Sequence, residues 1–263
     1  MAAETISIGP DGDQWHFSLA TKTYDLARGS EKKLRVQTTR GKEVDAIEIS
    51  PELSALVIVD MQNYFLHPKC RHHPLGLATV EPTMNIIEKC EDVGIQVVWL
   101  NWGLTEHDLA TMPAGTRRSP ARGMVTKTGI SSNYGEDLGS SQGRCLMAGT
   151  WNADIYEPLK EYSKPEDVYC DKNRLSGMWS EDQPLRKYLA ESGKKTLLFT
   201  GVNSDRCVLG TLADAAYCGW DCIAVEDCCA TATEEAHEVC VDNIELLHGF
   251  VIDSNTFCAA TTA

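Results

Sequence analysis

Six short, mostly apolar runs separated by helical patterns constrain the fold of this chain more than any other feature. They are Ala55 to Val59, Ile95 to Leu100, Asp167 to Cys170, Thr196 to Thr200, Trp220 to Val225 and Phe250 to Ile252. Runs of this length are typical of strands buried on both faces, as in parallel sheets covered by helices. The sequence therefore predicts an α/β fold with three layers, in which helices flank a six-stranded, mostly parallel sheet.

Helical patterns fill the segments between these runs. They are expected over residues 82–93, 152–162, 181–192, 205–217 and 234–247. Pro82 begins the first, and glycines follow the first and third, as is common at helix ends. Pro158 fits poorly inside the second.

Residues 1–50 differ from the rest of the chain. They are polar, with isolated apolar spots at Trp15 to Phe17 and at Tyr24 to Leu26. They are predicted to form an N-terminal extension that lies over a domain or a partner subunit and is disordered in part. Residues 51–263 are predicted to form one domain. Within it, residues 101–150 make a connection of a length that is typical of functional loops.

Composition limits the class of partner. The 263 residues carry a formal net charge of −14, whereas nucleic acids and anionic membranes require a basic face. No apolar run is long enough to span a bilayer. The eleven cysteines are scattered, without a Cys-x-x-Cys spacing, and no apolar signal segment is present at the N-terminus. A reducing, cytoplasmic environment is therefore expected, with no nucleic-acid or membrane partner.

The stretch TLLFTGVNSDRCV, residues 196–208, places a cysteine where it can react. A strand is expected to end at Gly201, and Ser204 is expected to cap a helix whose first turn holds Cys207. The free N–H groups and the dipole of a helix start favour a thiolate, and Arg206 adds positive charge. Cys207 is therefore either a nucleophile or, like most free cysteines, a small buried core residue.

Two more reactive side chains are expected at the same edge of the sheet. Asp60 follows the first strand and Lys172 closely follows the third, and ligands bind at the carboxyl ends of parallel strands. Taken singly, Asp60 could cap a turn and Lys172 could lie on the surface. Together with Cys207 they favour nucleophilic catalysis, in which Asp60 relays the thiol proton and Lys172 orients Asp60 and stabilises negative charge.

Three motifs carry a resemblance to a known family: VIVDMQNYF at 57–65, DKNRLSGMW at 171–179 and TGVNSDRCV at 200–208. In their order and spacing, they make residues 50–258 similar to the isochorismatase-like cysteine hydrolases. The resemblance implies a six-stranded parallel sheet and a covalent thioester-type intermediate on the triad of Asp60, Lys172 and Cys207. It also implies a cis peptide from Val202 to Asn203, which directs the amides of Asn203 and Cys207 toward an oxyanion, and a homodimer or homotetramer.

Metal binding distinguishes branches of this family. Its nicotinamidases carry an Asp-x-His pair after the second strand, where this chain reads Asn101-Trp102-Gly103. Two other groups lie nearby in sequence without ligand spacing: Glu106, His107 and Asp108, and Cys70, His72 and His73. Polar loop surface is the expected role of both groups, so neither a metal nor another cofactor is expected.

Other segments resemble the ureidoacrylate amidohydrolase branch, which cleaves a C–N bond in a small ureido acid. They include 99–103, 149–151, 174–177 and the tail from 243 to 258. The candidate substrate-binding residues are Gln62, Phe65, Trp102, Trp151, Arg174 and Ser176. A cluster of Arg117, Arg118 and Arg122 could bind a carboxylate or form a solvated loop face. For Gln62, capping a helix start is the alternative, and for the aromatic residues it is packing.

These features predict a metal-independent cysteine hydrolase that acts on a small amide or ureido compound. One alternative is hydrolysis of the enol ether of isochorismate, which releases pyruvate and need not use the thiol. Another, from a different class, is a catalytically silent binding or effector protein on the same fold.

Overall fold

The computed structural model describes residues 4–118, 125–126, 129–130, 134–139 and 141–262. Its centre is a six-stranded sheet in the order β10-β7-β6-β11-β12-β13. The strands are β6 (Ser54–Val59), β7 (Gln96–Trp102), β10 (Val168–Lys172), β11 (Thr196–Val202), β12 (Asp221–Ala230) and β13 (Gly249–Ile252). All five neighbouring pairs are parallel. The predicted α/β fold is thus confirmed, and its sheet is entirely parallel.

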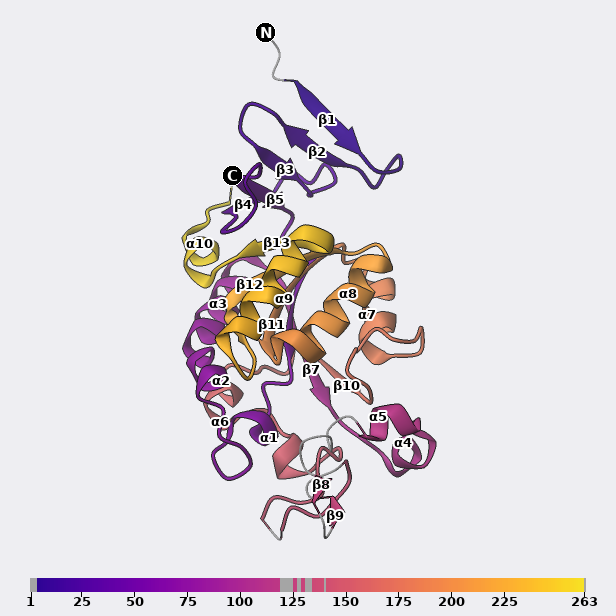
Figure 1. Cartoon of the computed structure of the whole chain (residues 1–263). Coiled ribbons are helices and arrows are strands. Elements are labelled where there is room, and N and C mark those ends of the chain that lie inside the picture. Colours follow the sequence, from indigo (N-terminus) through magenta and orange to yellow (C-terminus); the bar gives the residue numbers. More distant parts are fainter. Residues whose placement is uncertain (1–3, 119–124, 127–128, 131–133, 140, 263) are drawn as a thin grey trace.

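Helices cover both faces of this sheet (Figure 1). Crossovers of parallel strands are right-handed. The path from β6 through β7 to β10 runs across the sheet in one direction and carries α2 (Pro74–Ala78), α3 (Val80–Val93) and α6 (Glu157–Lys160). The path from β10 to β13 runs in the other direction and carries α7 (Pro184–Ser192), α8 (Leu209–Tyr217) and α9 (Glu234–Leu247). Because all these crossovers have the same hand but the two paths cross the sheet in opposite directions, the two groups of helices lie on opposite faces of the sheet. Among the described residues, no helix is long and apolar enough to cross a membrane.

The topology has a switch point between β6 and β11, because the chain leaves these adjacent strands toward opposite edges of the sheet. Every residue of both strands is buried. Gly201 on β11 has φ of +112°, and a Cβ there would lie 2.0 Å from the carbonyl oxygen of Val59. Only glycine permits this approach, which brings the carboxyl ends of the two strands together. A crevice at such a switch point is the usual ligand site in this class of fold.

Three segments differ from the sequence-based expectation. The helix predicted over 152–162 is replaced by a 3₁₀ turn, η1 (Trp151–Ala153), and by α6, because Pro158 fits in the first turn of a helix and not in its interior. Cys228 and Cys229 lie inside β12, which runs five residues beyond the predicted end. The tail holds α10 (Ser254–Ala259).

The connection 101–150 also contains ordered elements. It begins with α4 (Glu106–Thr111) and α5 (Ala114–Arg118) and includes the short pair β8 (Val125–Thr126) and β9 (Gly129–Ile130). A further short helix, α1 (Asn63–Leu66), follows β6. Figure 1 shows α4, α5, β8 and β9 together at one end of the molecule.

The N-terminal extension forms a sheet of its own at the opposite end (Figure 1). Its strands are β1 (Thr5–Ile8), β2 (Trp15–Ser18), β3 (Thr23–Asp25), β4 (Leu34–Gln37) and β5 (Ala46–Ile49), in the order β1-β2-β3-β5-β4. The rings of Trp15 and Tyr24 each lie 5.5 Å from that of Phe250 on β13. The apolar spots of the extension therefore pack on the large domain.

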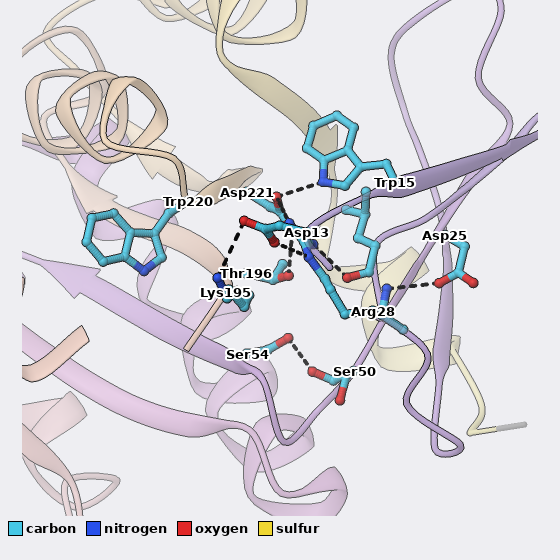
Figure 2. Close-up of polar contacts among 12 residues, drawn as sticks. Asp13, Trp15, Asp25, Arg28, Ser50, Ser54, Lys195, Thr196, Trp220 and Asp221 are labelled. Atoms are coloured by element: carbon cyan, nitrogen blue, oxygen red, sulfur yellow. Dashed lines mark hydrogen bonds and ion pairs between the residues drawn. The ribbon is translucent and has the colours of Figure 1, made fainter. Parts of the chain in front are cut away.

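A buried ion pair joins the extension to the large domain (Figure 2). The Arg28 guanidinium forms a two-pronged pair with the carboxylate of Asp221, which begins β12; one bond, from Nη2 to Oδ1, is 2.8 Å. The indole of Trp15 donates to Asp221 at 2.8 Å, and the hydroxyl of Thr196 donates at 3.1 Å. The side chains of Arg28 and Asp221 are 9% and 3% exposed. Arg28 also pairs with Asp13 at 2.9 Å, but removing the Arg28 charge would leave the buried Asp221 carboxylate without a counter-ion.

We expect Arg28→Met to lower the free energy of unfolding by about 3–5 kcal/mol, the usual cost of a buried charge that loses its partner. The measurement is urea denaturation followed by circular dichroism. Lys22→Met is the matched control: Lys22 pairs with Glu43 at 3.5 Å, but their side chains are 44% and 85% exposed. That pair should contribute only about 0–1 kcal/mol. Equal effects of the two substitutions would contradict the anchoring role of Arg28.

Candidate active site

Asp60, Lys172 and Cys207 meet at the carboxyl ends of three strands. Asp60 is the first residue after β6, Lys172 is the last residue of β10, and Cys207 lies in the turn after β11. The Lys172 Nζ is 3.0 Å from Asp60 Oδ2, and both side chains are fully buried. The Cys207 thiol lies close enough to the same carboxylate for the charge of Asp60 to raise the thiol pKa. One carboxylate thus interacts with both an ammonium and a thiol.

Backbone geometry directs these side chains toward one another. Asp60 has φ of +53°, an uncommon conformation for a residue other than glycine, and one that is found mostly where the surrounding structure enforces it. Its amide donates to the carbonyl oxygen of Leu100 on β7 at 2.9 Å. Lys172 is in register with Trp102, so their side chains leave the sheet on the same face.

Cys207 lies in a single π-helical turn, η2 (Ser204–Val208), which leads into α8. Ser204 was predicted to cap this helix, and that prediction is wrong. The residue at the N-cap is Asn203, while the Ser204 hydroxyl hydrogen-bonds to His237 Nδ1 at 2.9 Å. The carbonyl of Asn203 accepts hydrogen bonds from the amides of Arg206 and Val208, and the peptide between Val202 and Asn203 is cis.

The surroundings of Cys207 oppose the thiolate that a helix start favours. Burial, together with the negative charge of Asp60, raises the pKa of Cys207 to about 12, although Lys172 opposes the shift. Burial likewise raises the pKa of Asp60, and the ammonium of Lys172 counteracts this only in part. A helix start can favour a thiolate only where burial does not outweigh it, and Cys207 is 4% exposed. The resting pair is therefore a thiol beside a carboxylate that has an increased proton affinity.

Trp102 was predicted either to bind a substrate or to pack, and the structure packs it against Lys172. It is 2% exposed, and the Lys172 Nζ lies 4.0 Å from its ring centroid. Its side chain also lowers the pKa of the Cys207 thiol, against the effect of burial. Its ring lies 4.9 Å from that of Tyr134. Trp102 thus contacts the ammonium through its ring and favours the charged form of the thiol.

Gln62 and Phe65 are buried beside this centre. The Gln62 amide nitrogen donates to the carbonyls of Trp102 (2.8 Å) and Ala153 (2.6 Å), and its oxygen accepts the amide of Trp102 at 3.0 Å. Both of its N–H donors are therefore engaged, so Gln62 positions the end of β7 and has no donor left for a substrate. Phe65 is 8% exposed and packs edge-to-face on Tyr64 at 5.0 Å.

The other predicted substrate-binding residues have partners of their own. The Arg174 guanidinium lies 5.1 Å from the Trp179 ring, and its carbonyl accepts the Lys172 ammonium at 3.3 Å. Ser176 is 8% exposed, and its hydroxyl accepts the amide of Met178 at 2.9 Å. Trp151 packs against the imidazole of His67 at 4.9 Å. Of these three residues, the structure joins only Arg174 directly to the triad.

Two of the candidate carboxylate-binding arginines, Arg117 and Arg118, lie at the end of α5. Arg117 donates to the carbonyl of Leu109 at 3.3 Å, and Arg118 is the last residue of the helix. Arg122 lies outside the described residues. A carboxylate-binding role for this cluster stays a prediction.

His73 was considered only as a possible metal ligand, but the structure gives it a different place. Its Nδ1 accepts the amide of Gly76 at 3.1 Å, and its Nε2 lies 3.1 Å from the Asn203 side-chain oxygen. An acceptor at Nδ1 and a donor at Nε2 require a neutral ring, and burial lowers the pKa of His73 accordingly. His73 thus holds the residue that precedes the Cys207 turn.

The predicted metal-site alternatives do not assemble. Glu106 pairs with Arg144, and Asp108 caps α4 and accepts the Asn173 side chain at 2.6 Å. Across the part of the chain that is described, no three His, Cys, Asp or Glu side chains group as metal ligands. At the nicotinamidase position, a Cβ on Gly103 would lie 2.2 Å from the Asp171 carboxyl carbon. The Asp171 carboxyl therefore occupies the space that a metal-binding side chain at 103 would need.

Comparison with known proteins places this geometry in a family. The isochorismatase domain matches residues 54–256, so the match begins at β6 and leaves out β1–β5. A cysteine hydrolase from Pseudomonas syringae pv. phaseolicola is 17% identical with a TM-score of 0.65, covering 80% of this chain and 92% of its own.

Two further solved structures share the fold. N-carbamoylsarcosine amidase from Thermoplasma acidophilum is 24% identical with a TM-score of 0.57, covering 77% of this chain and 96% of its own. Pyrazinamidase/nicotinamidase from Streptococcus mutans is 18% identical with a TM-score of 0.58, covering 76% and 99%. Because the family match spans most of the sequence and the sheet is the one expected, this chain belongs to the isochorismatase family of hydrolases.

Proposed function

We propose that this protein is a cysteine hydrolase that cleaves a C–N bond in a small amide or ureido compound, with Asp60, Lys172 and Cys207 as its catalytic residues. The observation that carries the proposal is the position of the Asp60 carboxylate: the buried ammonium of Lys172 lies 3.0 Å from it, and its charge raises the pKa of the buried Cys207 thiol. A thiol beside a base that is oriented by a third group is the arrangement of an activated nucleophile.

The first step, the attack of the thiol, follows from the protonation states of Cys207 and Asp60. The sulfur of Cys207 attacks the substrate carbonyl carbon while its proton moves to the Asp60 carboxylate. The C–S bond forms, and the carbonyl π electrons move onto oxygen. The raised pKa of Asp60 helps this transfer, because a base is most effective when its pKa is near the operating pH. The amides of Asn203 and Cys207 would donate to the oxyanion.

The remaining steps release the amine, hydrolyse the intermediate and return the enzyme to its starting state. The tetrahedral adduct collapses, the C–N bond breaks, and the nitrogen leaves with the proton held by Asp60. Water then attacks the thioester-type intermediate and gives one proton to Asp60; the C–S bond breaks, and that proton returns to the sulfur. Overall, one amide and one water give one acid and one amine. Lys172 keeps a positive charge beside the carboxylate throughout and fixes its orientation.

A ureido substrate is favoured by two separate likenesses. Residues 99–103, 149–151 and 174–177 resemble the ureidoacrylate amidohydrolase branch, and the Thermoplasma neighbour is named for a carbamoyl compound. The rival reaction, cleavage of the isochorismate enol ether, releases pyruvate and does not need a thiol. The proposed mechanism does, and it releases ammonia or an amine.

The test is a panel of small ureido acids, amides and isochorismate, assayed for ammonia and for pyruvate. Ammonia release that is lost in Cys207→Ala would support the proposal. Pyruvate release that survives Cys207→Ala would support the enol-ether reaction instead. Turnover of no panel member, together with no selective alkylation of Cys207, would favour the silent binding protein.

We expect EDTA to leave turnover unchanged after prolonged dialysis. The physical reason is the absence of a ligand set at the nicotinamidase position, where Asn101 replaces the acid and the Asp171 carboxyl fills the space beside Gly103. Turnover before and after dialysis is the measurement, with zinc and manganese added back in parallel. Inhibition by EDTA that either metal reverses would show that the reaction depends on a metal.

A further inference from the structure

The strand β1 lies at the end of the N-terminal sheet, and its outer edge is open. Within the part of the chain that the structure describes, its only strand partner is β2. All four of its residues, Thr5 to Ile8, are exposed. Proteins usually protect such an edge with lysine, proline or a bulge, because a free strand edge pairs readily with another strand. The sequence TISI has none of these residues, and its pairing with β2 is regular.

The open edge presents the backbone groups of Thr5 and Ser7. The amide of Leu19 donates to the carbonyl of Glu4 at 3.3 Å, and Ile6 lies opposite Phe17 in the same ladder. In an antiparallel pair, the residues that bond to the partner strand alternate with residues that bond outward. Glu4, Ile6 and Ile8 therefore bond inward to β2, whereas the N–H and C=O groups of Thr5 and Ser7 point away from the molecule.

One face of this edge is apolar. Ile6 and Ile8 lie opposite Phe17 and Trp15, so all four side chains are on one face of the sheet. Toward the large domain this face is covered, since Trp15 packs on Phe250. At β1 the cover ends, and Ile6 and Ile8 are 46% and 45% exposed. The apolar face therefore continues outward beyond the surface that the large domain protects.

The distribution of charge along the chain favours the N-terminal extension as the contact between two copies. Residues 1–50 contain seven basic and eight acidic side chains, so they are nearly neutral. The excess of negative charge, which is −14 for the whole chain, therefore lies almost entirely in residues 51–263. Net charge therefore opposes the approach of two copies less at their extensions than at their large domains.

We propose that β1 is the contact of a twofold-symmetric dimer, in which β1 of one subunit pairs antiparallel with β1 of the other. The two five-stranded sheets would join into one of ten strands. With the twofold axis at Ile6, Thr5 lies opposite Ser7 of the partner subunit, and the outward N–H and C=O groups of both residues are satisfied. Ile6 then faces Ile6 of the partner subunit on the apolar face, in the closer of the two antiparallel pairings.

The position of β1 leaves the candidate active site open. Figure 1 shows the N-terminal sheet at the end of the molecule opposite α4 and α5, and α4 follows the carboxyl end of β7, where Trp102 lies. The extension also lies outside the family match. Pairing through β1 is therefore a property of this chain's own extension.

The test is sedimentation velocity on the full chain over a range of micromolar concentrations. Wild type should sediment as a dimer. Ser7→Pro removes one outward N–H and leaves the bonds to β2 intact, so we expect the dimer to dissociate at least about tenfold more readily. Ile6→Lys, which places two like charges at the axis, should have a larger effect. Ser7→Ala is the matched control: it removes the hydroxyl that contacts His16 but keeps the N–H, and it should remain dimeric.

Hydrogen exchange provides a measurement that does not depend on folding of the variants. The amides of Thr5 and Ser7 in wild type should be protected at high protein concentration and should exchange freely on dilution. A monomeric wild type would overturn the proposal. The open edge of β1 would then be available to pair with a strand of another protein. An oligomer whose mass is unchanged by both Ser7→Pro and Ile6→Lys would overturn it as well. A tetramer that both variants reduce to a dimer would support it.

Discussion

Cys207→Ala is expected to abolish turnover, lowering the rate by about 10⁴-fold or more, because removal of a nucleophile leaves only binding and oxyanion stabilisation. In the proposed mechanism the thiol forms the covalent bond to the substrate carbonyl, and Asp60 takes its proton. Cys207→Ser should also be nearly inactive, since a hydroxyl has a higher pKa than a thiol and is harder for the same carboxylate to activate. Product release under single-turnover conditions is the measurement.

Cys90→Ala is the matched control for this substitution. Cys90 is also fully buried, but it lies on α3 and packs in the core. It should retain activity while losing a similar amount of packing, which separates chemistry from stability. Circular dichroism should show that both variants are folded. Retention of more than a few per cent of the wild-type rate by Cys207→Ala would rule out the covalent mechanism and would favour the enol-ether reaction.

The fold of the large domain could be predicted because its signals are local. Each strand of the central sheet is a short apolar run, and the alternation with helices dictates parallel pairing. The N-terminal sheet could not be predicted in the same way. Its strands have three or four residues, and β3 pairs in parallel with β5 through a connection that carries no helix. Contacts between distant residues, such as Arg28 with Asp221, hold this sheet in place, and no periodicity in the sequence records them.

The proximity of Asp60, Lys172 and Cys207 could be predicted because parallel strands bring their carboxyl ends to one edge. Asp60 and Cys207 follow such ends, Lys172 is the last residue of its strand, and the structure brings the three residues to the same edge of the sheet. His73 and Tyr134 were missed as members of the site because each reaches it from a loop whose path the sequence does not reveal. The proton affinity of Cys207 is hard to predict for a related reason: the helix start is visible in the sequence, but the burial of the thiol is not.

We expect Lys172→Met to lower the turnover rate at neutral pH by about a hundredfold or more, the scale of one lost electrostatic stabiliser. Methionine approximates the length of the lysine stem but carries no charge. In the wild type, burial raises the pKa of Asp60, and the ammonium of Lys172 at 3.0 Å opposes that rise. Without the ammonium, the Asp60 pKa should rise further, and at neutral pH a larger fraction of the carboxylate would already hold a proton.

The pH dependence of kcat/KM should change in a defined direction in Lys172→Met. A base must be unprotonated to accept the thiol proton, so activity falls as pH drops through the Asp60 pKa. A cation beside a carboxylate usually lowers its pKa by about 1–3 units, so the acidic limb of kcat/KM should move to higher pH by about that amount in Lys172→Met. A lysine that merely packed in the core would change the rate or the stability but would leave this limb in place. Raising the pH should therefore restore part of the lost activity.

Lys187→Met is the control, because Lys187 pairs with Asp182 on an exposed surface where the two side chains are 54% and 88% exposed. It should change neither the rate nor the acidic limb, since an exposed pair is screened by solvent. Near-normal turnover of Lys172→Met with an unmoved acidic limb would show that Asp60 does not depend on Lys172, and the assignment of the triad would then be wrong. If turnover falls while the limb stays in place, Lys172 acts on the oxyanion alone and not on the proton affinity of Asp60. A fall accompanied by the shift is the outcome that the buried geometry requires.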